Sequence, residues 1–96
     1  MSIPKDLNKS FRPIIAGKII LTSELMRAAR SLLRWDQRHL SDASSVSLAT
    51  VKRLEAKPGI LVAHAPTIAA LRTAFEAAGI EFTNGDQPGV RLRRKT

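Results

Sequence analysis

Apolar residues recur at spacings of three and four over residues 22–79, a pattern typical of amphipathic helices. The spacing predicts a first helix from Thr22 or Ser23 to Leu33 or Arg34 and a second from about Gln37 to Ser44. It predicts a third helix from about Leu48 to Ala56 and a fourth from Thr67 to Ala78. The predicted buried positions are, helix by helix, Leu25, Ala29, Leu32 and Leu33; Leu40 and Ala43; Val51 and Leu54; and Ile68, Leu71, Phe75 and Ala78.

Polar, glycine and proline residues mark the ends of these helices. Hydroxyl or carboxylate side chains stand at the three N-caps, Thr22 or Ser23, Asp36 and Ser47. The turn Ser44-Ser45-Val46 joins the second and third helices and places Val46 against the core, and Ser41 is small enough to let the third helix approach. Pro58-Gly59 ends the third helix, Pro66 suits a first helical position, and Gly79 suits the position after a C-cap. Trp35 is predicted to pack between the first two helices.

The remaining segments favour short extended structure. Ile80 to Thr83 and Val90 to Arg93 alternate apolar and polar residues around a glycine-rich turn, which predicts a β-hairpin with Ile80 and Phe82 on one face. Lys18 to Leu21 could form another short strand, and Ile60 and Val62 could cover the core edge. The fold class is therefore mainly α, with four to five helices and a short C-terminal β-hairpin. We expect a basic arm at 1–21, the helical domain at 22–79, and the hairpin and basic tail at 80–96.

Composition narrows the functional classes. The chain has 96 residues, which is the length of one small domain. It contains no cysteine, and this excludes thiol catalysis and Cys-based zinc sites. No segment approaches the ~20 apolar residues of a membrane span. His39 and His64 are isolated and predicted to be surface residues. No nucleophile elbow or phosphate-cradling glycine loop is present, so the sequence argues against an enzyme and predicts no metal or cofactor.

Charge is the more informative property. Sixteen Lys and Arg against eight Asp and Glu give a net charge of +8. Residues 1–21 and residues 84–96 each carry +3, so the body between them carries only +2. Two basic ends on a nearly balanced body favour nucleic acid, although they could also aid solubility or bind acidic surfaces. Arg27, Arg30 and Arg34 form a predicted basic ridge that is either solvated or close to a DNA backbone.

The third helix carries the candidate chemistry. With Val51 and Leu54 pointing inward, its outer side holds Leu48, Ala49, Lys52 and Arg53. An outer side that mixes small, apolar and cationic residues suits a helix in the DNA major groove.

Residues 22–79 resemble the Xre/Cro/phage-repressor helix-turn-helix family. The matching residues are Leu25, Ala29, Leu32, Trp35, Gln37, Leu40, Val46, Ser47, Thr50, Val51, Leu54 and Glu55. The family often has glycine where Ser45 stands, because that residue tends to be left-handed, and serine adopts this conformation only at a cost. A small apolar residue is commoner where Ser44 stands.

The resemblance implies a role for each site residue. Leu48, Ala49 and Arg53 match positions that face base edges. Gln37 matches a glutamine that holds a DNA phosphate and braces the third helix, and Glu55 matches a largely structural acidic position. The phosphate-contacting set is Gln37, Arg38, Ser47, Thr50, Lys52 and Lys57.

The expected function is sequence-specific binding of double-stranded DNA by a cytoplasmic, prokaryotic transcriptional regulator. Arg53 can donate two hydrogen bonds to guanine, or can remain solvated or contact a phosphate, while Leu48 and Ala49 can contact thymine methyls. We expect a homodimer on paired half-sites, with the hairpin at 80–93 as the candidate contact. Its unpaired edges can pair with a second copy or with residues 18–21, or the hairpin only closes one end of the monomer. The main alternative is an antitoxin-like or accessory regulator that binds a protein partner. A third hypothesis is an RNA-binding protein. The lack of an aromatic stacking platform argues against it.

Overall fold

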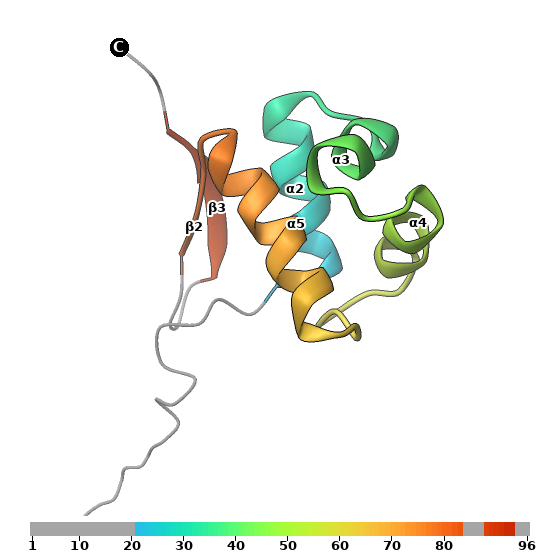
Figure 1. Ribbon diagram of the computed structural model, residues 1–96. Helices are drawn as coiled ribbons and strands as arrows, with labels where there is room; N and C mark the ends of the chain where they lie inside the picture. The colour runs from blue at the N-terminus through green and yellow to red at the C-terminus, as the bar shows by residue number, and fades with distance from the viewer. Residues whose placement is uncertain (1–20, 84–87, 94–96) are drawn as a thin grey trace, which may run out of the picture.

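The computed structural model describes residues 21–83 and 88–93, and in this part the protein is a small helical domain closed by a β-hairpin (Figure 1). Its elements are α2 (Ser23–Leu33), α3 (Gln37–Ser44), α4 (Leu48–Ala56), α5 (Ala65–Ala77), β2 (Ile80–Thr83) and β3 (Gly89–Leu92). The predicted fold class is confirmed, with four helices in the described part of the chain. Of the predicted arm at 1–21, with its possible strand at Lys18 to Leu21, only Leu21 is described; the hairpin turn at 84–87 and the tail at 94–96 lie outside the described residues.

Side-chain caps explain where the first three helices begin. The Thr22 hydroxyl accepts a hydrogen bond from the Leu25 amide, 3.0 Å, and so caps α2. The Asp36 carboxylate caps α3 by accepting from the His39 amide, 2.7 Å. The Ser47 hydroxyl caps α4 by accepting from the amide of Thr50, 3.1 Å. Each cap satisfies an amide that has no partner within its own helix, and the predicted spans of α3 and α4 are confirmed.

The predicted starts of α5 and β3 are wrong by one or two residues. Helix α5 begins at Ala65, so that Pro66 is its second residue; proline is tolerated there because amides of the first turn have no helical acceptor. Gly79, with φ of 103°, ends this helix as predicted. Strand β3 runs from Gly89 to Leu92, and the Arg93 amide then bonds to the Gly79 carbonyl, 2.7 Å.

The buried stripe of α2 differs from its prediction. Met26 and Ala29 are fully buried and Leu25 and Leu33 are partly buried, whereas Leu32 is 43% exposed. At 100° per residue, Leu32 lies about 120° around the helix from Met26. The packing of α2 centres on Met26, so the prediction that Leu32 is buried is wrong.

Two further core predictions are wrong for local reasons. In α3 the buried residue beside Leu40 is Ser44, and Ala43 is exposed. In the segment after α4, Leu61 is buried while Ile60 and Val62 are 65% and 77% exposed. The segment is extended at this point, because Thr22 and Ile60 form an antiparallel bridge, so alternate side chains point to opposite sides.

The hairpin packs its apolar face on the helices. Its register pairs Ile80 with Leu92 and Phe82 with Val90. Ile80 is buried, as expected from the face it shares with Phe82, and Phe82 contacts Phe75 of α5 edge-to-face at 6.0 Å. Trp35 is half-buried and packs against the core, and its ring stacks on Phe75 of α5, also at 6.0 Å.

The remaining helical core positions agree with the sequence. Leu40, Val51, Leu54, Leu71 and Phe75 are buried, and Val46, Ile68 and Ala78 are partly buried. In the ribbon, α2 and α5 form the middle of the domain, with α4 on one side and the hairpin on the other (Figure 1). The molecule therefore has two separate ends, a helical one and a β one.

Candidate nucleic-acid interface

Serine side chains build the turn between α3 and α4. Ser45 has φ of 64°, the left-handed conformation predicted for it, and its amide bonds to the Ser41 carbonyl, 2.9 Å. The Ser41 hydroxyl donates to the Val46 carbonyl, 2.6 Å. The Ser44 hydroxyl donates to the Leu40 carbonyl, 2.7 Å, and accepts from the Val46 amide, 3.2 Å. These bonds satisfy the turn's backbone, which is why a serine can occupy the buried position where an apolar residue is commoner.

Helix α4 presents one side to the core and the other to solvent. Val51, Leu54 and Glu55 are buried. The outer face of α4 consists of Leu48, Ala49, Lys52 and Arg53, of which the last three are exposed and Leu48 is half-buried. The structure therefore leaves the three predicted base-contacting residues, Leu48, Ala49 and Arg53, on the accessible side of one helix.

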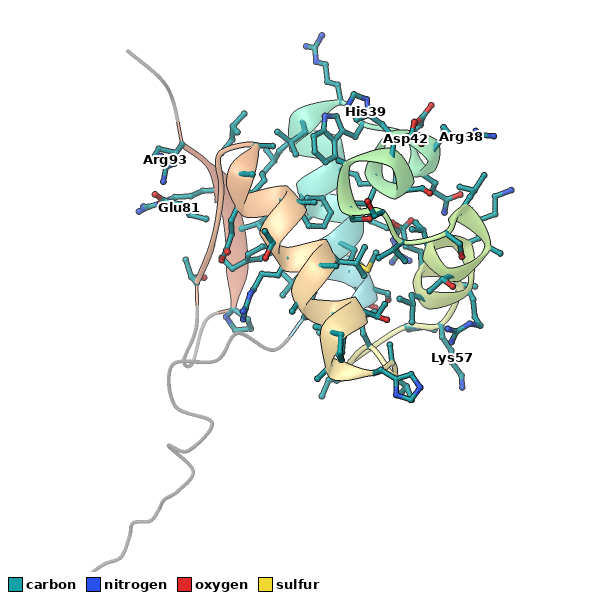
Figure 2. All side chains as sticks on the ribbon, in the orientation of Figure 1. Arg38, His39, Asp42, Lys57, Glu81 and Arg93 are labelled. Atoms are coloured by element: carbon teal, nitrogen blue, oxygen red, sulfur yellow. The ribbon has the colours of Figure 1, made fainter. Side chains whose placement is uncertain are left out.

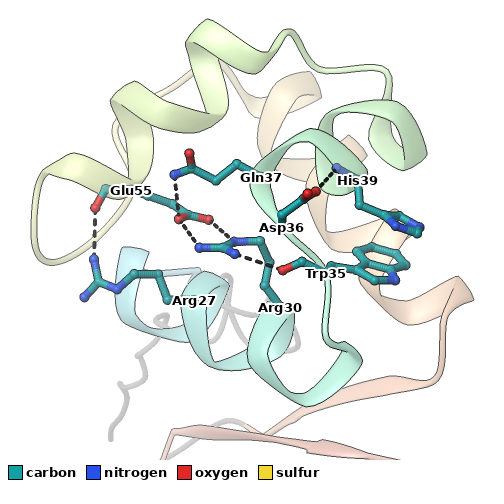
Figure 3. A network of polar contacts seen from close by, with 7 residues as sticks. All are labelled: Arg27, Arg30, Trp35, Asp36, Gln37, His39 and Glu55. Carbon is teal, nitrogen blue, oxygen red and sulfur yellow. Dashed lines mark hydrogen bonds and ion pairs between the residues drawn. The ribbon is translucent and has the colours of Figure 1, made fainter.

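A buried carboxylate holds α4 against the rest of the domain (Figure 3). Glu55 is only 4% exposed, and Arg30 of α2 binds both of its oxygens, from Nε at 2.8 Å and from Nη2 at 2.7 Å. Gln37 of α3 donates from Nε2 to Glu55 Oε1, 3.1 Å. Arg30 also donates to the Trp35 carbonyl, 2.9 Å. One acidic side chain thus ties together three helices, in agreement with the structural role implied by the resemblance.

The predicted basic ridge on α2 is wrong, because two of its three members turn toward α4. Arg30 lies only about 40° around the helix from Met26 and forms the ion pair with Glu55. The side-chain hydrogen bond from Arg30 to Glu55 is the main reason why the pKa of Arg30 is raised above its ordinary value. Arg27 donates from Nη1 to the backbone carbonyl of Glu55, 2.9 Å, and so caps the C-terminal turn of α4. Arg34 is exposed and ends α2 in a left-handed conformation.

These arginine roles were not predicted from the sequence. Arg27 and Arg30 precede Glu55 by 28 and 25 residues, so no local spacing connects them. One feature could have indicated the pairing of Arg30. It falls on the same side of α2 as the buried Ala29 and Met26, and a cation on a buried side requires a buried acceptor.

The predicted phosphate-contacting residues divide into two groups. Arg38, Lys52 and Lys57 are exposed, and Arg38 and Lys57 project from the side of the molecule that carries α4 (Figure 2). Ser47 and Thr50 bond to one another, with the Ser47 hydroxyl donating to Thr50 Oγ1 at 2.9 Å. The two hydroxyls stand at the N-terminal turn of α4, where the helix dipole favours an anion.

Gln37 makes the bracing contact with α4 that was predicted for it. It is half-buried, and its Nε2 donates one hydrogen to Glu55. A primary amide carries a second hydrogen on the same nitrogen, so Gln37 retains a donor for another acceptor. Glu55 therefore fixes which end of this amide is the donor.

A groove runs beside the C-terminal half of α4. It encloses about 390 Å³ and is lined by Arg53, Leu54, Ala56, Lys57, Ile60, Leu61 and Val62. Its lining combines the cationic Arg53 and Lys57 with apolar residues, among them the exposed Ile60 and Val62. A surface that pairs apolar and cationic groups can receive a duplex edge or a protein segment.

Within residues 21–83 and 88–93, no group of three or more His, Cys, Asp or Glu is placed to hold a metal ion. No helix in the same ranges is both long and apolar enough to cross a bilayer. His39 is exposed and stacks on Trp35 at 4.6 Å, and His64 is the N-cap residue of α5. No protein-family model matches this chain, and the search of curated proteins found no match either.

Proposed function

We propose that this chain is a sequence-specific DNA-binding transcriptional regulator that inserts the outer face of α4 into the major groove. The observation that carries the proposal is the asymmetry of α4. Its inner side is fixed by the buried Glu55, while Lys52 and Arg53 on its outer face make no ion pair within the part of the chain that the structure describes. Exposed cations on a rigidly held helix are suited to an anionic partner of fixed shape.

Each residue of the outer face then has a chemical role. Arg53 donates two hydrogen bonds to the O6 and N7 atoms of a guanine, and Leu48 and Ala49 contact thymine methyl groups. Gln37, Arg38, Lys52 and Lys57 bind phosphates on either side, with Ser47 and Thr50 at the N-terminal turn of α4. Phosphate contacts supply most of the affinity, and the three base-facing side chains supply the specificity.

We further propose that the protein acts as a homodimer on paired half-sites in the cytoplasm of a prokaryotic cell. A helix as short as α4 contacts few base pairs, and a second copy doubles the number of base pairs that are recognised. The outer backbone edges of the β2–β3 hairpin are the proposed contact between copies. Because the hairpin and α4 lie on opposite sides of the domain, pairing through it predicts half-sites more than one helical turn apart (Figure 1).

Selection of bound fragments from a random duplex pool tests this proposal. We expect an enriched motif that contains a G·C pair and occurs twice with twofold symmetry. Mobility-shift titrations of that motif at two salt concentrations should show affinity falling steeply as salt rises. No enrichment, together with binding that is equal for all polyanions, would contradict sequence-specific recognition.

A protein-binding regulator is the second candidate. The exposed Ile60 and Val62 and the half-buried Leu48 favour it, because these side chains place apolar area around α4. In that case the mobility shift should be absent or insensitive to salt. Substitution of Ile60 and Val62 by serine separates the two, since it should leave DNA affinity nearly unchanged and abolish binding of a protein that docks on the groove.

A further inference from the structure

The extended segment that follows α4 has one paired backbone edge and one open edge. The Leu61 amide donates to the Leu21 carbonyl, 3.0 Å, and the Ser23 amide donates to the Gly59 carbonyl, 2.9 Å. In extended backbone, successive amides point to opposite edges. The amides on either side of Leu61 therefore point away from this pairing.

These two amides belong to Ile60 and Val62, and they make no hydrogen bond within residues 21–83 and 88–93. A row of open amides is a template for pairing with another extended chain. The side chains of Ile60 and Val62 are 65% and 77% exposed, more than any other large apolar residue in the described part of the chain. Exposed apolar side chains beside an open edge are what the addition of a strand covers.

The groove that this segment lines is also cationic. Its lining of Ile60, Leu61 and Val62 is completed by residues of the C-terminal half of α4, together with Lys57. Among these, Arg53 and Lys57 are exposed, and neither makes an ion pair in the part of the chain that the structure describes. An uncharged or basic occupant would leave both cations without a partner, whereas carboxylates would pair with them.

The β2–β3 hairpin has open edges too, and its charge differs. Arg91 and Arg93 are already paired with Glu81, at 2.7 and 3.1 Å. The hairpin edge therefore does not select an acidic partner, whereas the groove beside α4 does.

From these observations we infer that the groove beside α4 binds an extended segment of a partner protein, in which acidic residues alternate with apolar ones. The backbone of the segment pairs with the open edge at Ile60 and Val62, and its apolar side chains cover these two residues. Its carboxylates bind Arg53 and Lys57. The inference goes beyond DNA binding and gives the chemistry of the partner in the protein-binding candidate.

One consequence rests on the proposed function. Arg53 belongs both to the groove and to the outer face of α4 that enters the major groove. A segment bound in the groove therefore excludes the duplex, and the partner regulates DNA binding by competition.

Selection from a random peptide library displayed on phage, with the full chain as bait, tests the inference. We expect the enriched peptides to alternate acidic and apolar residues. An enriched peptide is then synthesised and titrated into the isotope-labelled chain. The largest NMR shift changes should occur at the Ile60 and Val62 amides, and hydrogen exchange at these two amides should slow. No enrichment, enriched peptides without acidic residues, or shift changes confined to the hairpin would overturn the inference.

Two matched double variants show whether the cations of the groove select the peptide. Arg53→Gln with Lys57→Gln should weaken binding of the enriched peptide by about tenfold, because it removes both ion pairs. Arg34→Gln with Arg72→Gln removes the same charge from residues that do not line the groove, and it should bind like the parent. Equal weakening in the two variants would mean attraction by net charge alone and would contradict a site in the groove.

Displacement of a labelled duplex tests the competition separately. The enriched peptide should release the selected duplex from the parent chain, and a complex that holds both would contradict the shared use of Arg53. If the chain binds the peptide at Ile60 and Val62 but binds no duplex, the proposed function fails and the groove inference stands. If it binds the duplex but enriches no peptide, the groove inference fails alone.

Discussion

Two glutamates on opposite sides of the domain bind arginines, and they differ in exposure. Glu55 of α4 is 4% exposed and binds Arg30 and Gln37 from two other helices. Glu81 of β2 binds Arg91 and Arg93, whose side chains are 73% and 63% exposed, within its own hairpin. The first acid joins elements distant in sequence, and the second pairs with two cations of its own hairpin.

This difference shows how the domain distributes its charges. At the helical end the acid lies beneath α4, so it orients the helix without neutralising Lys52 and Arg53 on its outer face. At the β end the acid lies at the surface and is paired with the cations around it. Lys52 and Arg53 therefore stay exposed and without an ion pair among the described residues, which supports the proposed binding of an anionic partner at this end.

The largest effect is expected when an aspartate on the inner face of α4 is compared with one on its outer face. Val51→Asp places a carboxylate at a position with no exposure, and its desolvation cost exceeds what a small domain can offset. We expect loss of the helical far-ultraviolet circular dichroism signal and of the thermal transition. Ala49→Asp, two residues away on the outer face, should stay folded and lose DNA binding through charge repulsion. A folded Val51→Asp variant would contradict the assignment of the inner face.

Truncation of the two glutamates compares the two ends directly. Glu55→Ala leaves Arg30 in a largely buried site without its carboxylate, which should reduce the free energy of unfolding by about 3 kcal/mol. Urea denaturation measures this loss. Glu81→Ala should hardly move the transition, because the pairs that it removes are exposed. Similar losses of unfolding free energy in the two variants would contradict the proposed difference between the helical end and the β end of the domain.

Within the outer face, Arg53→Ala and Lys52→Ala should have different signatures. Loss of Arg53 should cost about 1–3 kcal/mol of binding to the selected duplex and relax the preference at one base pair. Loss of Lys52 should weaken binding to all duplexes alike and reduce the salt slope by about 1. Titrations of the selected duplex and of single-base variants distinguish these patterns. If Arg53→Ala weakens every duplex equally, Arg53 is a phosphate contact.

Local signals in the sequence predict much of this fold. The caps Asp36 and Ser47 and the 3.6-residue period predict the spans of α3 and α4, because both signals act within one turn. The sequence does not determine which of several apolar residues becomes buried. Leu32 is exposed and Met26 is buried because packing against other elements sets the rotation of α2. Likewise, pairing with Leu21, forty residues earlier, turns Leu61 inward.

The candidate site can likewise be predicted only in part from the sequence. The accessible residues of α4 follow from its period, since Val51 and Leu54 fix the side that faces inward. The network around Glu55 does not, because it depends on the distance between three helices.

A smaller effect is expected at the turn that precedes α4. Ser45 has φ of 64°, where an L-residue is strained by roughly 1–2 kcal/mol, and glycine loses roughly 0.5–1 kcal/mol in chain entropy. Ser45→Gly should therefore stabilise the domain by about 0.5–1 kcal/mol in urea denaturation. Ser44→Gly should instead destabilise it, because it removes the hydroxyl that bonds to Leu40 and Val46. Stabilisation by both variants would argue against strain at Ser45.

The smallest effect concerns the pH dependence of the hairpin. Hydrogen bonds from Arg91 and Arg93 lower the pKa of Glu81 below its ordinary value of 4.5. A carboxylate whose pKa is lower in the folded state adds stability that is fully present above pH 4.5 and is lost as the pH falls through the folded pKa. The protection factor of the Arg93 amide, which is the intrinsic exchange rate divided by the observed one, should therefore fall below that pH in the parent and depend less on pH in Glu81→Gln. Glu24, whose pKa is lowered by hydrogen bonds from its own backbone amide and from the Gly59 amide, is the matched control at the helical end. Glu24→Gln should leave the hairpin's pH dependence intact, and a loss in that variant would mean that the acid response belongs to the whole domain.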